Sequence, residues 1–362
     1  MQSNQSNQSF QINNDMNDKH ETEETIKTEE PSLHSLPQTE SDINNINNIN
    51  NNNEKKEEIQ TTDYLTKNYI GDENHQIDES SEQIQFFSER IVRIEKLEKC
   101  KFLKRLYLRK NLIKTIENLD SLTQLEDLEL YDNQITKIEG LDSLINLTIL
   151  DLSYNLIKKV EGLESLVNLT TLYLVENRIK RIENVNMLKN LFELDFGSNK
   201  ISEIENLEGM EEKLIRLSLA KNKIKHISNI SHLVNLTFLT LQSNRLICIS
   251  GLESLVNLQE LYLSQNFIEK IENLTSLSRL KILDLAYNRI KTLEGLENKP
   301  VLEDLWLNNN EIKNFSDMDE LVKVPTLTCI YLWKNPVSEF PSYREVILKY
   351  CKKITQIDST FL

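Results

Sequence analysis

The 362-residue sequence is poor in the residues that many catalytic and disulfide-bonded sites need. It has only 7 Gly, 5 His and 4 Cys, and it contains neither a glycine-rich phosphate loop nor a pattern with metal-ligand spacing. The four cysteines are Cys100, Cys248, Cys329 and Cys351, and none is part of a Cys-x-x-Cys spacing. We therefore expect them to be reduced thiols in or near the core of a protein in a reducing compartment. We expect neither a signal peptide nor a membrane span, because no apolar run is long enough for either.

Positive charge is also scarce. The formal net charge is −15, and residues 1–80 hold 17 acidic and 5 basic side chains, which leaves −3 for the other 282 residues. Binding to nucleic acid or to an anionic membrane needs clustered Lys and Arg. The composition therefore argues against both kinds of partner.

What the sequence does have is a repeat. The phrase L-x-x-L-x-L-x-x-N returns nearly always after 22 residues, as in Leu125, Leu128, Leu130 and Asn133. This is the pattern of a leucine-rich repeat. It predicts an α/β solenoid, a curved horseshoe with a parallel β-sheet on the concave face and short helical or 3-10 segments on the convex face. The asparagines that close the phrase are Asn111, Asn133, Asn155, Asn177, Asn199, Asn222, Asn244, Asn266, Asn288 and Asn310, and Asn335 completes 11 repeats.

Each part of the phrase has a physical reason. A single repeat can bury its leucines only when another repeat packs on each side of it. The stability of the solenoid therefore increases with the number of stacked repeats. The asparagine side chain can bond the backbone groups left open where the chain turns out of the strand. We therefore assign the asparagines to architecture and not to catalysis.

Four regions follow from the composition. Residues 1–80 are rich in Asn, Gln, Ser and Glu and are predicted to be a disordered acidic tail, either regulatory or a tolerated extension. Residues 81–100 match the outer half of a repeat and are predicted to be an N-terminal cap. Residues 101–335 are the repeats. Residues 336–362, with a predicted helix at Tyr343–Tyr350, are predicted to be the C-terminal cap.

Function in a solenoid is expected on the strand residues that point away from the core. Reading these positions in every repeat gives eight carboxylates, three arginines and eight aromatic side chains. Exposed aromatics dominate binding energy at protein interfaces, and the acidic groups would select a basic partner. Stiffening of the sheet by aromatic pairs across neighbouring strands is the simpler alternative. The predicted partner-binding residues are Asp151, Tyr173, Asp195, Phe238, Glu260, Tyr262, Asp284, Asp304, Trp306 and Tyr331.

An enzyme is a weaker alternative. The pairs Asp127 and Glu129, and Glu193 and Asp195, share a face about 7 Å apart, close to the spacing in a two-carboxylate hydrolase. Such pairs arise automatically from acidic residues at alternate strand positions, and nothing adds a nucleophile or a pocket. We therefore predict no catalytic residue, no metal ligand and no cofactor.

Two motifs carry a family resemblance. The outer half of the repeat is of the type I-x-x-I-E-G-L-x-x-L-x-N-L, as in the stretches Ile138–Leu147 and Ile249–Leu258. The ending is N-P-x-x-x-x-P-x-Y-R at Asn335–Arg344, followed by Ile357, Asp358 and Phe361. Over residues 86–362 the chain resembles the leucine-rich-repeat regulatory subunits of protein phosphatase 1. The short repeat and cap alone are shared with spliceosomal and ciliary proteins, so a general interaction scaffold of that type stays open.

The resemblance implies a non-catalytic subunit that docks its concave face on the phosphatase catalytic subunit, largely in the nucleus, with the cytoplasm also open. It assigns docking roles to Asp151, Tyr173, Asp195, Asp304, Trp306 and Tyr331. Ser218 departs from the family, which tends to carry an aromatic there.

A third regulatory protein is a further expected partner. Basic side chains cluster on the convex side, and a solvated outer face explains them equally well. They include Lys158, Lys159, Arg178, Lys180 and Arg181.

Overall fold

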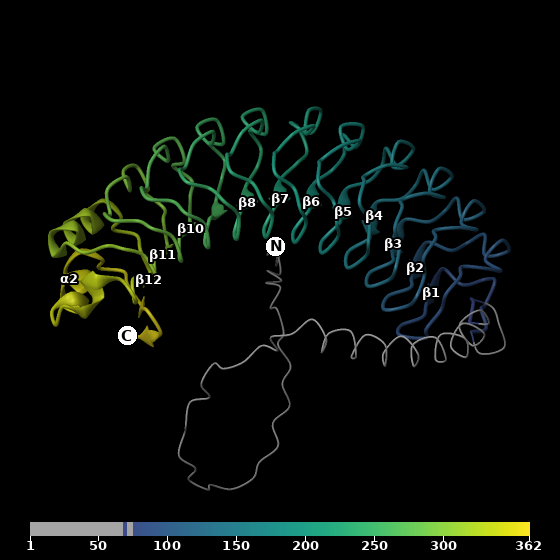
Figure 1. Ribbon diagram of the computed structural model, residues 1–362, viewed down its shortest axis with the longest axis horizontal. Helices are drawn as coiled ribbons and strands as arrows, with labels where there is room; N and C mark the ends of the chain where they lie inside the picture. Colours follow the sequence, from purple (N-terminus) through teal and green to yellow (C-terminus); the bar gives the residue numbers. More distant parts are fainter. Residues whose placement is uncertain (1–67, 71–74) are drawn as a thin grey trace, which may run out of the picture. The chain divides into compact units, whose positions relative to one another are not determined.

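The computed structural model describes residues 68–70 and 75–362, all within the second of two compact units, Glu58–Leu362. These residues form a solenoid whose strands line the inner side of an arc (Figure 1). The predicted fold class is confirmed. The strands are β1 (Gln83–Gln85), β2 (Arg105–Tyr107), β3 (Asp127–Glu129), β4 (Ile149–Asp151), β5 (Thr171–Tyr173), β6 (Glu193–Asp195), β7 (Arg216–Ser218), β8 (Phe238–Thr240), β9 (Glu260–Tyr262), β10 (Ile282–Asp284), β11 (Asp304–Trp306), β12 (Cys329–Tyr331), β13 (Gln356–Ile357) and β14 (Thr360–Phe361).

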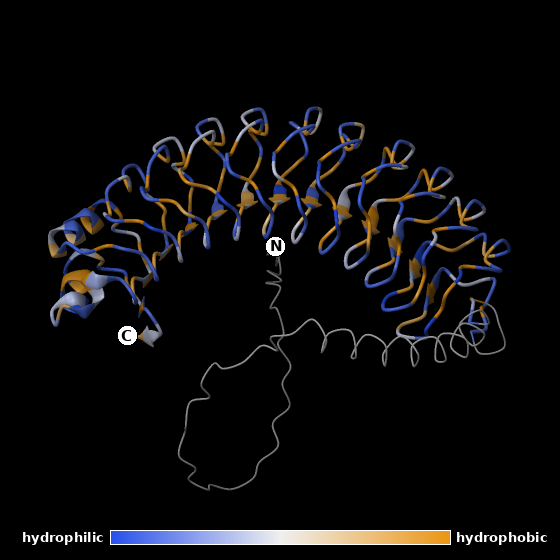
Figure 2. Ribbon diagram, viewed as in Figure 1, coloured by the Kyte–Doolittle hydropathy of each residue, from blue (hydrophilic) through white to orange (hydrophobic). Residues whose placement is uncertain are grey.

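The strands form one 14-stranded sheet in chain order. Every pairing is parallel except that of β13 with β14. The register is the same at each step, so that Leu128 lies beside Leu150 and Leu150 beside Leu172. These central leucines are fully buried and form one continuous core with the other repeat leucines and isoleucines. Figure 2 shows the apolar residues returning in each coil along the arc.

The predicted short helical or 3-10 segments of the convex face form, among the described residues, only near the C-terminal end. In the described residues most outer segments are successive single turns, such as Leu144 N to Leu141 O and Leu147 N to Leu144 O, both 3.0 Å. These bonds are three residues apart and do not overlap into a helix. The helical elements that form are the 3-10 helices η1 (Phe315–Lys323) and η2 (Pro336–Glu339) and the α-helix α2 (Tyr343–Tyr350). None of the described helices is long and apolar enough to cross a lipid bilayer.

One position in the outer segment explains why the turns take this form. It holds Asn or Gly with positive φ, for example Asn184 at 56° and Gly162 at 66°. A Cβ at Gly162 would lie 2.7 Å from the carbonyl oxygen of Ile138 in the preceding coil. Asn184 instead reaches back and donates to the carbonyl of Val160 at 2.7 Å. From Asn118 to Gly295 each such position holds Asn or Gly, which adopt a positive φ more readily than other residues, while Lys96 holds it in the first coil with a φ of 57°.

The predicted role of the ladder asparagines is confirmed, and all eleven are buried. Asn177 is typical. Its Oδ1 accepts from the backbone N–H of Ile157 at 3.0 Å, and its Nδ2 donates to the carbonyls of Leu152 at 2.9 Å and Leu174 at 3.2 Å. The N–H of Ile157 and the carbonyl of Leu152 belong to the preceding coil. The side chain therefore closes its own turn and fixes the distance to its neighbour.

At the N-terminal end, most of the predicted disordered tail lies outside the described residues. The described pieces of it contact the first coil: Ile70 is fully buried, and Val92 donates its N–H to the carbonyl of Asn68 at 2.9 Å. The next residues hold a strand that the sequence analysis missed, β1, in which Ile84 takes the place of the central leucine. The leucine phrase is absent there, so the pattern gave no signal.

At the C-terminal end, the motif that begins at Asn335 has a structural explanation. Asp358 accepts from the N–H groups of Leu332 and Trp333, both at 2.9 Å. Its carboxylate thus takes the place of a strand carbonyl of the next coil, such as that of Tyr331, which accepts from the N–H of Leu307. Tyr343 donates its hydroxyl to the other carboxylate oxygen of Asp358 at 3.0 Å. The predicted helix is present as α2 and buries Tyr343 and Ile347. Tyr350 ties it to η1 through a 2.6 Å bond to Asp319.

One core position breaks the leucine pattern. Lys299 stands where the preceding coil has Leu277, and it is 1% exposed. Its ammonium donates to the carbonyls of Leu274 at 2.6 Å and Glu297 at 2.9 Å. Burial lowers the pKa of Lys299 to about 8. The backbone carbonyls are the partners that keep a cation tolerable inside the coil.

The ladder yields a stability prediction. Asn177→Ala leaves one N–H and two carbonyls inside the solenoid without their side-chain partner, and each buried unsatisfied group costs about 1–3 kcal/mol. We expect the free energy of unfolding to fall by about 3 kcal/mol, measured by urea denaturation. Asn168→Ala is the matched control, because Asn168 is exposed and makes one bond, to the carbonyl of Ile145. Equal losses in the two variants would contradict the ladder's role.

Candidate protein-binding face

The concave face is built from the two residues that flank the buried centre of each strand. In β4, for example, Leu150 is buried while Ile149 and Asp151 are partly exposed on the other side. The register then aligns these side chains from strand to strand. Asp151 pairs with Tyr173, and Tyr173 with Asp195. Further along, Tyr262 pairs with Asp284, Asp284 with Trp306 and Trp306 with Tyr331.

All ten predicted partner-binding residues lie in these two rows. Seven share the row of the third strand position, namely Asp151, Tyr173, Asp195, Tyr262, Asp284, Trp306 and Tyr331. Phe238, Glu260 and Asp304 lie in the row of the first position. The prediction that these residues share one face thus agrees with the geometry, while their binding role stays a prediction.

The aromatic side chains gather in the C-terminal half of the face. Ring centroids are 5.5 Å apart for Phe238 and Tyr262, 6.2 Å for Tyr262 and Trp306, and 6.3 Å for Trp306 and Tyr331. These distances are those of favourable aromatic pairs. The rings contact one another, as the stiffening interpretation requires, and remain partly exposed, as the interface interpretation requires.

The prediction of a solvent-exposed carboxylate is wrong for Asp284. Tyr262 and Trp306 belong to the strands on either side of it, and their rings come within 6.2 Å of each other across the strand that holds Asp284. Asp284 is consequently only 5% exposed. Sequence alternation gave the correct direction for this side chain but could not show that its neighbours cover it.

Three aspartates of the face also support the backbone. Asp151, Asp195 and Asp284 accept from the N–H two residues later, at 2.9, 2.7 and 3.0 Å. The residue that donates is small in each case: Ser153, Gly197 and Ala286. A Cβ at Gly197 would lie 3.0 Å from the carboxylate of Asp195. Burial raises the pKa of all three aspartates above its usual range.

Tyrosine hydroxyls bind carboxylates of the same face. Tyr173 donates to Glu193 at 3.2 Å, and Tyr262 donates to Glu260 at 3.1 Å. Tyr107 donates to Asp127 at 2.9 Å. Burial is the larger cause, and this hydrogen bond the second, of a rise in the pKa of Tyr107 to about 12. These bonds hold the phenol rings in place at neutral pH.

The three arginines neutralise only part of the negative charge. Arg109 pairs with Glu129, and Arg216 pairs with Glu193 at 3.4 Å while lying 3.9 Å from the centroid of the Phe238 ring. Arg105 bonds Gln83. Within the described residues, no Lys or Arg lies within 4.0 Å of the other carboxylates predicted to bind a partner. These are Asp151, Asp195, Glu260, Asp284 and Asp304.

The carboxylate pairs of the enzyme alternative are engaged in these contacts. Asp127 accepts from Tyr107, and Glu193 from Arg216 and Tyr173. A hollow of about 100 Å³ lies beside Glu193 and Asp195, bounded by Arg216, Ser218 and Phe238. It opens where Ser218 replaces the larger side chain that the family resemblance would lead one to expect.

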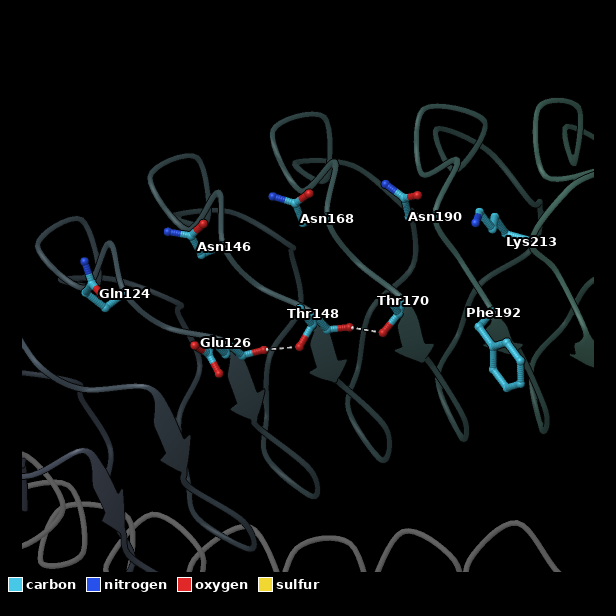
Figure 3. Close-up of a pocket in the computed structure, with 9 residues that line it drawn as sticks. All are labelled: Gln124, Glu126, Asn146, Thr148, Asn168, Thr170, Asn190, Phe192 and Lys213. Carbon is cyan, nitrogen blue, oxygen red and sulfur yellow. Dashed lines mark hydrogen bonds between the residues drawn. The ribbon is translucent and has the colours of Figure 1, made fainter. Parts of the chain in front are cut away.

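Another hollow lies on a different side of the solenoid. A trough of about 770 Å³ runs along the edge where the strands begin, lined by Asn146, Asn168 and Asn190 (Figure 3). Its polar side chains bond the preceding coil: Asn146 donates to the carbonyl of Thr123 at 2.8 Å, and Thr148 to that of Glu126 at 2.9 Å. The trough thus follows from a second ladder of hydrogen bonds between coils.

The raised pKa of Asp284 predicts how the contribution of this side chain to stability changes with pH. A carboxyl group whose pKa is higher in the folded than in the unfolded protein stabilises the fold at low pH, and this contribution is lost as pH rises through the folded pKa. Asp284→Asn cannot ionise, so we expect its Tm to exceed that of the wild type by about 2 °C at pH 7.5 and by less at pH 4.

Asp120→Asn, at an exposed position of an outer segment, is the control for this measurement and should leave Tm unchanged at both values. A lower Tm for Asp284→Asn at pH 7.5 would show that the charged carboxylate is needed for the fold.

Two family models match the chain. The model described as "Leucine-rich repeat" matches residues 258–360, and the model described as "Leucine Rich repeats (2 copies)" matches residues 123–165, 167–209 and 234–276. A comparison with curated protein sequences found no match. The family models therefore carry the sequence-level assignment.

Solved structures with similar folds include two bacterial proteins. An internalin from Listeria monocytogenes is 25% identical with a TM-score of 0.63, over 77% of this chain and 87% of that one. A leucine-rich-repeat protein of Leptospira interrogans is 25% identical with a TM-score of 0.67, over 74% and 70%. The repeats, the solenoid and these similarities agree. The chain is a leucine-rich-repeat protein, and its fold is that of a typically non-catalytic scaffold for protein interactions.

Proposed function

We propose that this protein is a non-catalytic regulatory subunit that binds the catalytic subunit of protein phosphatase 1 through its concave face. The observation that supports it most is the joint placement of acidic and aromatic side chains in two aligned rows. Four partly exposed carboxylates, Asp151, Asp195, Glu260 and Asp304, have no basic partner within the described residues, so the face complements a basic protein surface. Its control of activity, maturation or location would come from occupying the partner's surface.

The resemblance to the phosphatase subunits supplies the identity of the partner. The residues it singles out, Asp151, Tyr173, Asp195, Asp304, Trp306 and Tyr331, all belong to the two rows. They are not equally free to bind. Asp151 and Asp195 also hold backbone N–H groups, whereas Asp304 forms no salt bridge with any described residue and lies close to Trp306 on the same strand. Asp304 and Trp306 are therefore the strongest single contributors that we assign.

A general interaction scaffold of the spliceosomal or ciliary type is the second candidate. It is favoured by the generic nature of the repeat and by Ser218, whose side chain leaves a hollow in the middle of the face. Under either function the concave rows bind protein. The resemblance further leads us to propose a nuclear location, with the cytoplasm as the alternative.

Binding of the purified phosphatase catalytic subunit to the full-length chain tests the proposal by calorimetry. A buried aromatic anchor contributes about 2 kcal/mol or more, so we expect Trp306→Ala to weaken binding about thirtyfold. Phe102→Ala is the matched control. Phe102 is 65% exposed and lies in the outer segment before β2, so its loss should change affinity less than about twofold.

Asp304→Lys provides a second variant, because Trp306 contacts two other rings and its loss could also loosen the face. We expect it to abolish binding while the melting temperature stays near that of the wild type. Tight binding by both variants would contradict the assigned face. Absence of binding by the wild type would remove the phosphatase as partner and leave the general scaffold.

A further inference from the structure

A second charged surface lies on the edge where the chain leaves the strands. The residue that follows each ladder asparagine is basic in four consecutive coils: Arg178, Lys200, Lys223 and Arg245. Each donates its backbone N–H to a carbonyl of the preceding coil at 2.8 Å. The acceptors are Ile157, Ile179, Ile201 and Ile224. The four side chains thus stack in a ladder with a step of about 4.8 Å, and all four are exposed.

Three more lysines extend this ladder sideways. The chain is extended after each asparagine, so residues two positions apart point to the same side. In the coil of Asn177, Arg178 and Lys180 are exposed while Ile179 between them is buried. Lys158 and Lys225 hold the position of Lys180 in other coils and are exposed as well. We call the set Lys158, Arg178, Lys180, Lys200, Lys223, Lys225 and Arg245 the basic edge.

The basic edge is not neutralised from within the described part of the chain. None of its seven side chains lies within 4.0 Å of a carboxylate there. Other basic residues of the same solenoid are paired: Lys137 with Glu139 at 2.8 Å, Arg181 with Glu205 at 2.9 Å. Two like charges about 5 Å apart repel by just under 1 kcal/mol even in water. A run of unpaired cations at this spacing favours an anionic ligand.

The surroundings limit how wide that ligand can be. A row of glutamates, Glu161, Glu183 and Glu205, lies a few residues further along the same coils. A broad polyanion such as a nucleic acid duplex would meet these carboxylates, and the chain as a whole is acidic. An extended peptide is narrow, and its alternate side chains point to one side about 7 Å apart. Flexible Lys and Arg side chains can reach carboxylates at that spacing.

We propose that the basic edge binds an extended acidic segment of a protein partner. This surface is distinct from the concave rows in position and opposite in charge, so a partner there would leave the concave face free. The proposal does not depend on the identity of the concave partner.

The test uses the full-length protein and a fluorescein-labelled peptide of alternating Glu and Ser, with binding followed by fluorescence anisotropy. The test variant replaces Arg178, Lys200, Lys223 and Arg245 by Gln. The control variant replaces Lys99, Lys104, Lys291 and Lys323 by Gln. These four lysines lie outside the basic edge and pair with glutamates, so the control loses as much positive charge as the test variant does. We expect the test variant to weaken binding at least about tenfold and the control less than about twofold.

Several results would overturn the proposal. Failure of the wild type to bind the peptide would do so, as would equal weakening in both variants, which would indicate net charge alone. A short DNA duplex of equal charge serves as competitor. If it displaced the peptide at lower concentration than unlabelled peptide does, the edge would be a nucleic-acid surface. Circular dichroism melting of both variants confirms that the substitutions leave the fold intact.

Discussion

The structure depends on the requirement that buried backbone polar groups be hydrogen-bonded. Each coil turns its chain out of a three-residue strand, and the turn leaves groups that no strand partner can satisfy. One buried asparagine per coil supplies the missing bonds and takes two of its partners from the preceding coil, as Asn177 does with Ile157 and Leu152. The same constraint therefore closes the turns and sets the register. A uniform register then aligns side chains from unrelated parts of the sequence in continuous rows.

Those rows are where the sequence is free to vary. The leucines and asparagines are fixed by packing and hydrogen bonding, while the flanking strand positions need only tolerate partial burial. This chain fills them with carboxylates and aromatic rings, and it fills the neighbouring edge with Lys and Arg that pair with no carboxylate of the described residues. In the coils of Asn155 and Asn199 the two surfaces carry opposite charge only a few residues apart. A scaffold of this kind can hold two chemically different partners without a pocket or a catalytic group.

The repeat period predicted much of this, because a 22-residue spacing leaves few alternatives for the fold, for the ladder asparagines or for the direction of Trp306 and Tyr262. It could not predict contacts between side chains. The covering of Asp284 depends on how two rings lean across a strand, and the backbone bonds of Asp151 and Asp195 depend on turn geometry. Strand β1 was missed because the residues around Ile84 do not follow the leucine phrase. The burial of Lys299 was missed because it depends on nearby carbonyls that accept from a cation at a leucine position.

The central claim is that the concave rows are a protein-binding surface. Hydroxyl-radical footprinting of the full-length protein, with and without the purified phosphatase catalytic subunit, measures this most directly. The account predicts that oxidation of Tyr262, Trp306 and Tyr331 falls when the partner is present, while that of the exposed Phe102 stays the same. Protection confined to Phe102 and other residues outside the concave rows, with Trp306 oxidised as in the free protein, would contradict it.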